Sequence, residues 1–126
     1  MTTNAAIWLD HREARIFHLH DNATKETTVT APGAEAHHQQ PRGHEGSHEH
    51  PADAKHFFQD IARTVEGADK VLVVGPSTAK LDFLRYLHLH HHLLEPKVVG
   101  VETVDHPTNG QLVAYAKTYF GAQLMR

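Results

Sequence analysis

Four consecutive apolar residues, Val71 to Val74, constrain the fold of this chain more than any other feature. A short apolar run without alternation is typical of a strand that is buried on both faces, as in a parallel sheet. Gly75-Pro76-Ser77 ends the run, because glycine and proline interrupt regular structure. A second run, with Val98, Val99 and Val101, predicts another buried strand of the same kind.

Three segments have the residue spacing of amphipathic helices. The first begins at Pro51, ends at Gly67 and has its apolar face at Ala54, Phe57, Phe58, Ile61 and Val65. The second is capped by Ser77 or Thr78, ends before Pro96 and has its apolar face at Leu81, Leu84 and Leu87. The third begins with the capping box Thr108–Gln111, ends at Gly121 and has its apolar face at Leu112, Tyr115, Ala116, Tyr119 and Phe120.

The first 30 residues predict three antiparallel strands. Ala5 to Asp10 is a short apolar run, and Glu13 to His20 alternates between two faces, with Arg15 on the same face as apolar neighbours. The β-branched run Thr27–Thr30 predicts the third strand. This strand would lie at an edge of the sheet, where a second copy of the chain could pair with it. A homo-oligomer is therefore possible.

The predicted elements follow the order βββαβαβα. A meander followed by strands that alternate with helices predicts a mixed α/β sheet, with the last strands joined by right-handed crossovers. We therefore predict a single domain over residues 1–126, with a ribonuclease H-like fold and the strand order 3-2-1-4-5. The chain length fits this prediction, because one domain most often has about 100 to 150 residues.

A long polar segment, residues 31–51, separates the meander from the first helix and contains histidines 37, 38, 44, 48 and 50. We predict a flexible histidine-rich loop here. Connections of this length inside a compact domain are usually functional or lack fixed structure. The segment is therefore the first candidate for a site.

The composition excludes several classes of function. The chain has no cysteine, so disulfides, thiolate metal sites and cysteine nucleophiles are excluded. No apolar stretch reaches the roughly 20 residues that span a bilayer, and the N-terminus does not resemble a secretion signal, so we expect a soluble cytoplasmic protein without a membrane partner. The formal net charge is −3, with the 14 histidines counted as neutral, and provides no basic field for nonspecific nucleic-acid binding.

Three stretches of the chain, residues 8–17, 71–81 and 98–120, resemble a known family. They contain Trp-Leu-Asp-His-Arg-Glu-Ala-Arg-Ile-Phe before the histidine-rich loop, and Gly-Pro-Ser-Thr-Ala-Lys and Val-Glu-Thr-Val-Asp-His-Pro after it. This pattern is similar to that of small bacterial proteins called translational machinery proteins. These in turn resemble the middle domain of archaeal and eukaryotic peptide release factors and of their ribosome-rescue relatives.

The resemblance implies a translation-associated protein. In release factors, the loop between the third strand and the first helix carries Gly-Gly-Gln, which positions the water that hydrolyses peptidyl-tRNA. This chain has glutamines and glycines in its loop, but in a different order and spacing, so the resemblance implies no hydrolysis, and we assign no catalytic residue. It implies contact with the ribosome or RNA through His37, His38, Gln39, Gln40, Arg42 and Gly43.

Metal binding is the main alternative function. Neutral imidazoles bind zinc and nickel, and three loop histidines with glutamates between them are candidate ligands: His44, His48 and His50. A second histidine cluster lies near the end of the second helix. Its candidate ligands, which would share one helical face, are His88, His91 and His92.

The predicted fold also raises a metal-dependent nuclease or hydrolase as a second alternative. Such sites need several carboxylates on neighbouring elements to hold two ions. Asp10 ends the first strand, where one such acid is expected, and Glu102 and Asp105 follow the last strand. The run Val71–Val74 contains no acid, which favours a protein without enzymatic activity.

A helix that opens directly after a buried strand has free backbone amides at its start. Such amides are candidates for binding an anion, because the positive end of the helix dipole also lies there. In this chain the candidate anion-binding residues are Gly75, Ser77 and Thr78.

Overall fold

A computed structural model describes residues 3–20, 23–31 and 51–124, and its elements follow the predicted order. The strands are β1 (Asn4–Leu9), β2 (Glu13–Leu19), β3 (Thr24–Thr30), β4 (Lys70–Gly75) and β5 (Val98–Thr103). The helices are α1 (Pro51–Thr64), α2 (Ala79–His90), the short 3-10 helix η2 (Glu95–Lys97) and α3 (Asn109–Leu124). No helix in the described part of the chain is long and apolar enough to cross a membrane.

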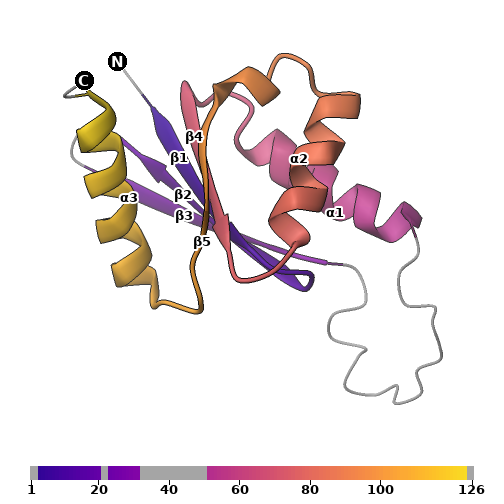
Figure 1. The fold of residues 1–126 in the computed structure, drawn as a ribbon, viewed down its shortest axis with the longest axis horizontal. Helices are drawn as coiled ribbons and strands as arrows, with labels where there is room; N and C mark the ends of the chain where they lie inside the picture. Colours follow the sequence, from indigo (N-terminus) through magenta and orange to yellow (C-terminus); the bar gives the residue numbers. More distant parts are fainter. Residues whose placement is uncertain (1–2, 21–22, 32–50, 125–126) are drawn as a thin grey trace.

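The five strands form one mixed sheet in the order β3-β2-β1-β4-β5 (Figure 1). β1 is antiparallel to β2, and β2 is antiparallel to β3, which confirms the predicted meander. β4 runs parallel to β1, and β5 runs parallel to β4. Ile7 of the central strand β1 lies between Ile16 of β2 and Val73 of β4. The predicted ribonuclease H-like topology is therefore confirmed.

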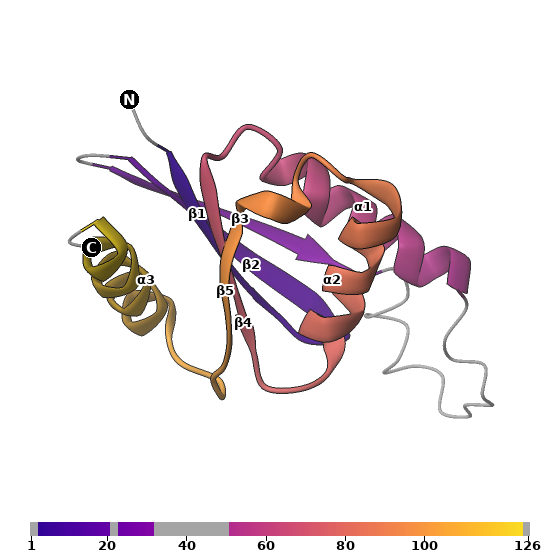
Figure 2. The same ribbon diagram turned by 45° about the horizontal axis from the view of Figure 1, so that its top comes forward.

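Helices cover both faces of the sheet (Figure 2). α1 and α2 lie on one face, over an apolar cluster that includes Ile7 and Val73. α3 lies on the other face, over a cluster that includes Trp8 and Phe17. Successive residues of β1 enter different clusters, because side chains of a strand point alternately to opposite faces. Burial on both faces explains why β1 and β4 are continuous apolar runs.

The buried face of α2 differs from the prediction. Ala79, Phe83 and Leu87 are fully buried at a spacing of four residues, whereas Leu81 is 53% exposed. Leu84 is half-buried. The leucines of this helix lie on more than one side, and the Phe83 ring packs in the same apolar cluster as Phe58 of α1, with 5.7 Å between the ring centroids. Leucine spacing therefore predicted Leu87 correctly and Leu84 in part, but it misplaced Leu81 and missed Phe83.

The start of α3 follows the prediction, but its end and part of its face do not. The amide of Thr108 donates to Gln111 Oε1 at 2.9 Å, and the amide of Gln111 donates to Thr108 Oγ1 at 3.1 Å, which confirms the capping box. Tyr115 is 38% exposed, although it was predicted to be buried. Gly121 does not end the helix, because it lacks the left-handed conformation of a C-terminal cap.

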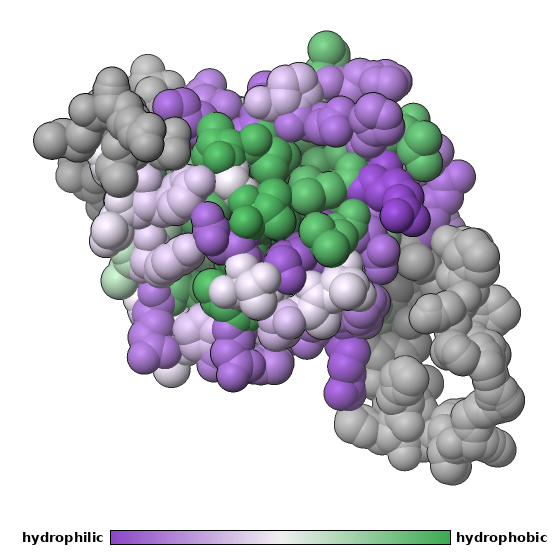
Figure 3. Space-filling model, viewed as in Figure 1, coloured by the Kyte–Doolittle hydropathy of each residue, from purple (hydrophilic) through white to green (hydrophobic). Residues whose placement is uncertain are grey.

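β5 is an edge strand and is less buried than predicted. Val98, Val99 and Val101 are only half-buried, and apolar side chains are visible over β5 and the adjoining side of α2 (Figure 3). The pairing of β5 with β4 contains a bulge. The Tyr119 hydroxyl donates to Val99 O at 3.1 Å beside this bulge, and both features hinder pairing with another chain.

β3 forms the opposite edge of the sheet. Its seven residues pair with β2 in an uninterrupted antiparallel register, and its other side has no strand beside it among the described residues. Pairing of this edge with a second copy of the chain stays a prediction.

Candidate functional site

The parallel strands end at one edge of the sheet, which we call the carboxyl edge. β1, β4 and β5 end there, and β3 does too, because two successive antiparallel pairings make it parallel to β1. In open α/β sheets, ligands bind outside the carboxyl ends of strands, at the point where the following helices turn to opposite faces. Here α2 follows β4 on one face and α3 follows β5 on the other. The carboxyl edge is therefore the candidate site.

The segment predicted to form the histidine-rich loop follows β3 at this edge. It follows Ala31, whose amide donates to Arg12 O at 2.8 Å in the β1–β2 turn. At its other end, α1 begins at Pro51 and leads to the opposite edge, where β4 begins (Figure 1). The loop residues predicted to contact RNA or metal lie outside the described residues: His37, His38, Gln39, Gln40, Arg42, Gly43, His44, His48 and His50.

Asp10, at the end of β1, organises the turn beside this attachment point. Its Oδ1 accepts hydrogen bonds from the amides of Arg12 at 2.8 Å and Glu13 at 3.0 Å. Its Oδ2 is 4.0 Å from His106 Nε2, and His106 Nδ1 is 2.9 Å from Asp105 Oδ1. The turn after β1 and the connection after β5 are therefore in contact.

A polar network extends from this connection over the α3 face of the sheet. Trp8 Nε1 donates to Asp105 O at 2.8 Å, and the Arg15 guanidinium lies 4.4 Å from the Trp8 ring centroid. Arg15 Nη1 donates to Asn109 Oδ1 at 2.7 Å, and Asn109 Nδ2 donates to Glu26 Oε2 at 2.8 Å. Sequence reasoning missed this network, although alternation along β2 had already placed Arg15 on an apolar face.

The carboxylates proposed for a nuclease do not form a metal site in the described part of the chain. Glu102 and Asp105 are exposed, and Asp10 is engaged in its turn. In residues 3–20, 23–31 and 51–124, no three histidine, aspartate or glutamate side chains are grouped so that they could hold a metal ion. The geometry therefore does not support a two-metal reaction around Asp10.

The turn between β4 and α2 also lies at the carboxyl edge. A Cβ atom on Gly75 would lie 2.2 Å from Leu9 O, so only glycine fits beside β1. Thr78 is the N-cap residue of α2, but its side chain makes no capping hydrogen bond. The amide of Ala79 makes only a long contact, 3.5 Å, with Ser77 Oγ. Gly75, Ser77 and Thr78 thus lie together at the position predicted for an anion site.

Lys80 lies beside this turn and was not predicted from the sequence. It is 7% exposed, and its Nζ donates to Ser77 O at 2.6 Å. Its spacing from Phe83 and Leu87 is the sequence signal that could have placed it on the buried side of α2.

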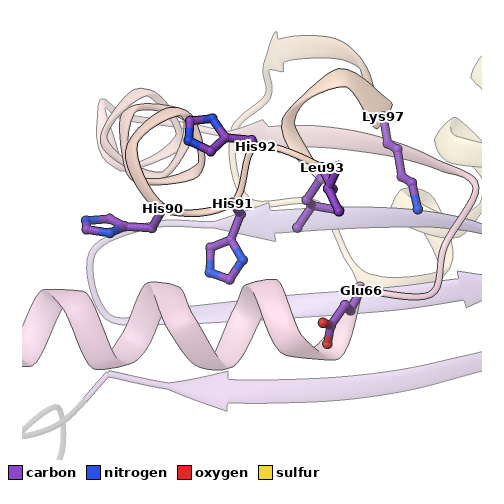
Figure 4. Close-up of a pocket in the computed structure, with 7 residues that line it drawn as sticks. Glu66, His90, His91, His92, Leu93 and Lys97 are labelled. Carbon is purple, nitrogen blue, oxygen red and sulfur yellow. The ribbon is translucent and has the colours of Figure 1, made fainter.

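The histidines at the other end of α2 do not share one helical face as predicted. The helix ends at His90, and His91 leaves it with φ −140°. His90, His91 and His92 point in different directions around a pocket of about 390 Å³ (Figure 4). The remaining lining residues are Glu66, Leu93, Leu94 and Lys97. Within the described residues, His88, His91 and His92 are not brought together as one set of ligands.

Most of these histidines contact a neighbouring side chain. His88 Nδ1 is 3.2 Å from Glu95 Oε1, and His91 Nε2 is 3.3 Å from the Tyr86 hydroxyl. The His90 ring lies over Tyr86, with 4.8 Å between the centroids. Burial raises the pKa of Tyr86, and the Arg63 guanidinium opposes the rise. These contacts hold the end of α2 in place.

Among the comparisons with known proteins, the search of solved structures found similar folds. No protein-family model matches this chain, and no curated protein matches its sequence. Among solved structures, it is similar to Pelota of Thermoplasma acidophilum, with a TM-score of 0.66 and 22% identity over 98% of this chain and 34% of that chain. Pelota of Archaeoglobus fulgidus gives a TM-score of 0.62 and 17% identity over 92% of this chain and 31% of that chain.

A third similar structure is an archaeal translation termination factor, aRF1. Its TM-score is 0.54 and its identity is 17%, over 87% of this chain and 32% of that chain. The chain therefore spans about a third of the length of each of these proteins. The predicted resemblance to the middle domain of release-factor-like and ribosome-rescue proteins is confirmed in the fold.

Proposed function

We propose that this chain is a cytoplasmic, translation-associated protein that contacts the ribosome or RNA through the histidine-rich loop and does not hydrolyse peptidyl-tRNA. The observation that carries the proposal is the fold, which is similar over 87% of the chain to a translation termination factor and over 98% to Pelota. Fold alone does not determine function. The proposal therefore also depends on where the loop is attached.

The position of the loop supports the proposed contact with the ribosome or RNA. The described residues on either side of it, Ala31 and Pro51, connect it to β3 and α1, the elements that flank the working loop of release factors. Loops that carry function are commonly held in this way by a rigid scaffold. The scaffold here includes the Asp10 turn and the Ala31–Arg12 hydrogen bond.

The sequence supports the absence of hydrolysis. No Gly-Gly-Gln occurs in the chain. A Gly-Gln pair does occur at Gly110-Gln111, but the Gln111 side chain accepts a hydrogen bond from the Thr108 amide in the capping box. The Gln111 side chain is therefore engaged in capping the start of α3.

Ribosome sedimentation at moderate salt tests the contact. One variant replaces five loop residues by serine: His37, His38, Gln39, Gln40 and Arg42. We expect its affinity for ribosomes to fall about tenfold or more relative to wild type, because phosphate and base contacts of this kind each contribute about 1 kcal/mol or more. The stability of the fold should not change, since no replaced residue belongs to the described core.

A matched control carries His44→Ser, His48→Ser, His50→Ser and Lys117→Gln. It has the same loop length and the same loss of one formal positive charge, and Lys117 is exposed on α3. We expect this control to bind ribosomes within about twofold of wild type, given the usual spread of such measurements. Equal sedimentation of all three proteins, or no sedimentation of any, would refute the contact. Loss of binding only in the control would instead favour the metal-ligand histidines.

A further inference from the structure

The outer side of β3 is an edge of the sheet with no strand beside it among the described residues. Backbone hydrogen bonds at both ends of β3 show how the strand faces β2. The His20 amide donates to Ala23 O at 2.9 Å before the strand, and the Ala31 amide donates to Arg12 O at 2.8 Å after it. Both pairs continue the register of β2 and β3. Because hydrogen-bonded pairs alternate along antiparallel strands, the odd-numbered residues of β3 bond to β2.

The even-numbered residues of β3 therefore turn their N–H and C=O groups away from β2. They are Thr24, Glu26, Thr28 and Thr30, and all four are exposed. Each presents one backbone donor and one backbone acceptor on the outer side. A row of such groups is a template on which another strand can pair.

β3 lacks the features that hinder pairing at the opposite edge. β5 has a bulge, and the Tyr119 hydroxyl occupies Val99 O. The pairing of β3 with β2 has no bulge, and its sequence, Thr-Lys-Glu-Thr-Thr-Val-Thr, contains no proline and mostly β-branched residues. Such residues favour extended strands. The backbone of β3 is thus regular and ready to accept a further strand.

A second copy of β3 fits this edge in an antiparallel register. A two-fold axis beside Thr27 places Thr24 opposite Thr30 of the second copy, and Glu26 opposite Thr28 of the second copy. Every outward residue then faces another outward residue, and each of these pairs exchanges two backbone hydrogen bonds. All seven residues of β3 are paired in this register. The edge is therefore complementary to itself, as a two-fold interface requires.

The neighbouring registers that match outward residues are less favourable. An axis beside Glu26 places this carboxylate directly opposite its own copy, and like charges directly opposite are destabilising. An axis beside Thr28 requires a backbone donor from Pro32, which has no N–H. In the Thr27 register the two Glu26 side chains are only diagonal neighbours, and Glu26 Oε2 accepts a hydrogen bond from Asn109 Nδ2 at 2.8 Å.

We propose that β3 pairs with β3 of a second copy of this chain, antiparallel and around a two-fold axis beside Thr27, so that the two sheets become continuous. Main-chain hydrogen bonds provide the affinity in such strand addition. The contact of one strand pair is small, so the dimer should be weak, with a dissociation constant on the order of 100 µM. The proposal does not depend on contact with the ribosome.

Sedimentation velocity of the full chain over a range of concentrations tests the pairing. We expect wild type to change from monomer to dimer as its concentration rises. Thr27→Lys and Thr27→Glu should each weaken the dimer about fivefold or more, because each places like charges directly opposite across the axis. An equimolar mixture of the two variants should recover a dimer at least as strong as that of wild type, since lysine then faces glutamate.

Thr28→Pro tests the outward direction of the backbone. The Thr28 N–H points away from β2, and proline is tolerated in edge strands at such positions, so the fold should be kept. The dimer should weaken about tenfold or more, because the axis loses a donor on each side. Thr28→Ala is the matched control, which keeps the N–H and should dimerise within about threefold of wild type.

Three results overturn the proposal. Wild type that stays monomeric at every concentration excludes the dimer, including the case in which another part of the chain covers the edge. Equal dimerisation of folded Thr28→Pro and Thr28→Ala excludes pairing through the backbone of β3. A mixture of Thr27→Lys and Thr27→Glu that dimerises no better than either variant alone excludes this register, and it decides the question where Thr28→Pro does not fold.

Discussion

Phe83→Ala should lower the free energy of unfolding by about 3 to 5 kcal/mol, the range for removing a fully buried aromatic side chain. Phe83 is fully buried in the cluster beneath α1 and α2, and its ring centroid is 5.7 Å from that of Phe58. Its removal leaves a cavity between the helices and the sheet. Chemical denaturation measured by circular dichroism gives the value.

Leu81→Ala is the matched control in the same helix. Leu81 is 53% exposed, so its replacement should change the free energy of unfolding by no more than about 0.5 kcal/mol. The pair distinguishes the observed face of α2 from the one that leucine spacing predicts. Equal losses in the two variants, or a larger loss in Leu81→Ala, would mean that the Leu81 side of α2 packs against the core.

Gly75→Ala should also be strongly destabilising, by about 3 kcal/mol, at the upper end of what overpacking usually costs. The new Cβ would lie 2.2 Å from Leu9 O, which is a backbone atom of the adjacent parallel strand. A flexible side chain could move away, but β1 is held between β2 and β4 and cannot. Thermal and urea denaturation measure the loss.

Gly67→Ala is the control for this substitution. A Cβ on Gly67 would meet no atom within 4 Å, so alanine should be accepted there with a change of about 0.5 kcal/mol or less. Similar stability of Gly75→Ala and wild type would contradict the close approach of β1 and β4 at the carboxyl edge. The positions of the Asp10 turn and of the turn between β4 and α2 would then need revision.

The sequence predicted the sheet well because its strands are distinguished by simple patterns. β4 is a continuous apolar run that is buried on both faces, and β2 alternates between a face toward α1 and a face toward α3. These periodicities depend only on whether one or both faces are covered. The capping box at Thr108 was predictable for a related reason, since its two partners are three residues apart.

Features that depend on the packing of distant elements were not predictable from such patterns. The buried face of α2 was predicted only in part, because a helix with leucines on several sides gives no clear stripe. Leu87 is buried as predicted, but Phe83, which packs against Phe58 of α1, was missed. β5 looked buried, but its place at the edge of the sheet leaves its valines half-exposed. α3 continues through Gly121, because glycine can adopt the left-handed conformation that ends a helix but does not have to.

In the candidate site too, local features were predictable from the sequence and contacts between distant residues were not. Asp10 was singled out from its place at a strand end, and its bonds to the turn amides are local. The Trp8–Asp105 and Arg15–Asn109 contacts join residues that are 97 and 94 positions apart, so they require the strand order to be known first. Lys80 was not singled out from the sequence, because its spacing did not reveal that its Nζ donates to Ser77 O.

A single reaction can show whether the chain contacts ribosomes without hydrolysing peptidyl-tRNA, as proposed. Ribosomes that carry peptidyl-tRNA are incubated with the purified chain, and binding and peptide release are followed in the same reaction. We predict saturable binding that depends on the loop residues His37 to Gly43, with peptide release no faster than in buffer. Release above the buffer rate, or ribosomes that bind no protein, would contradict the account.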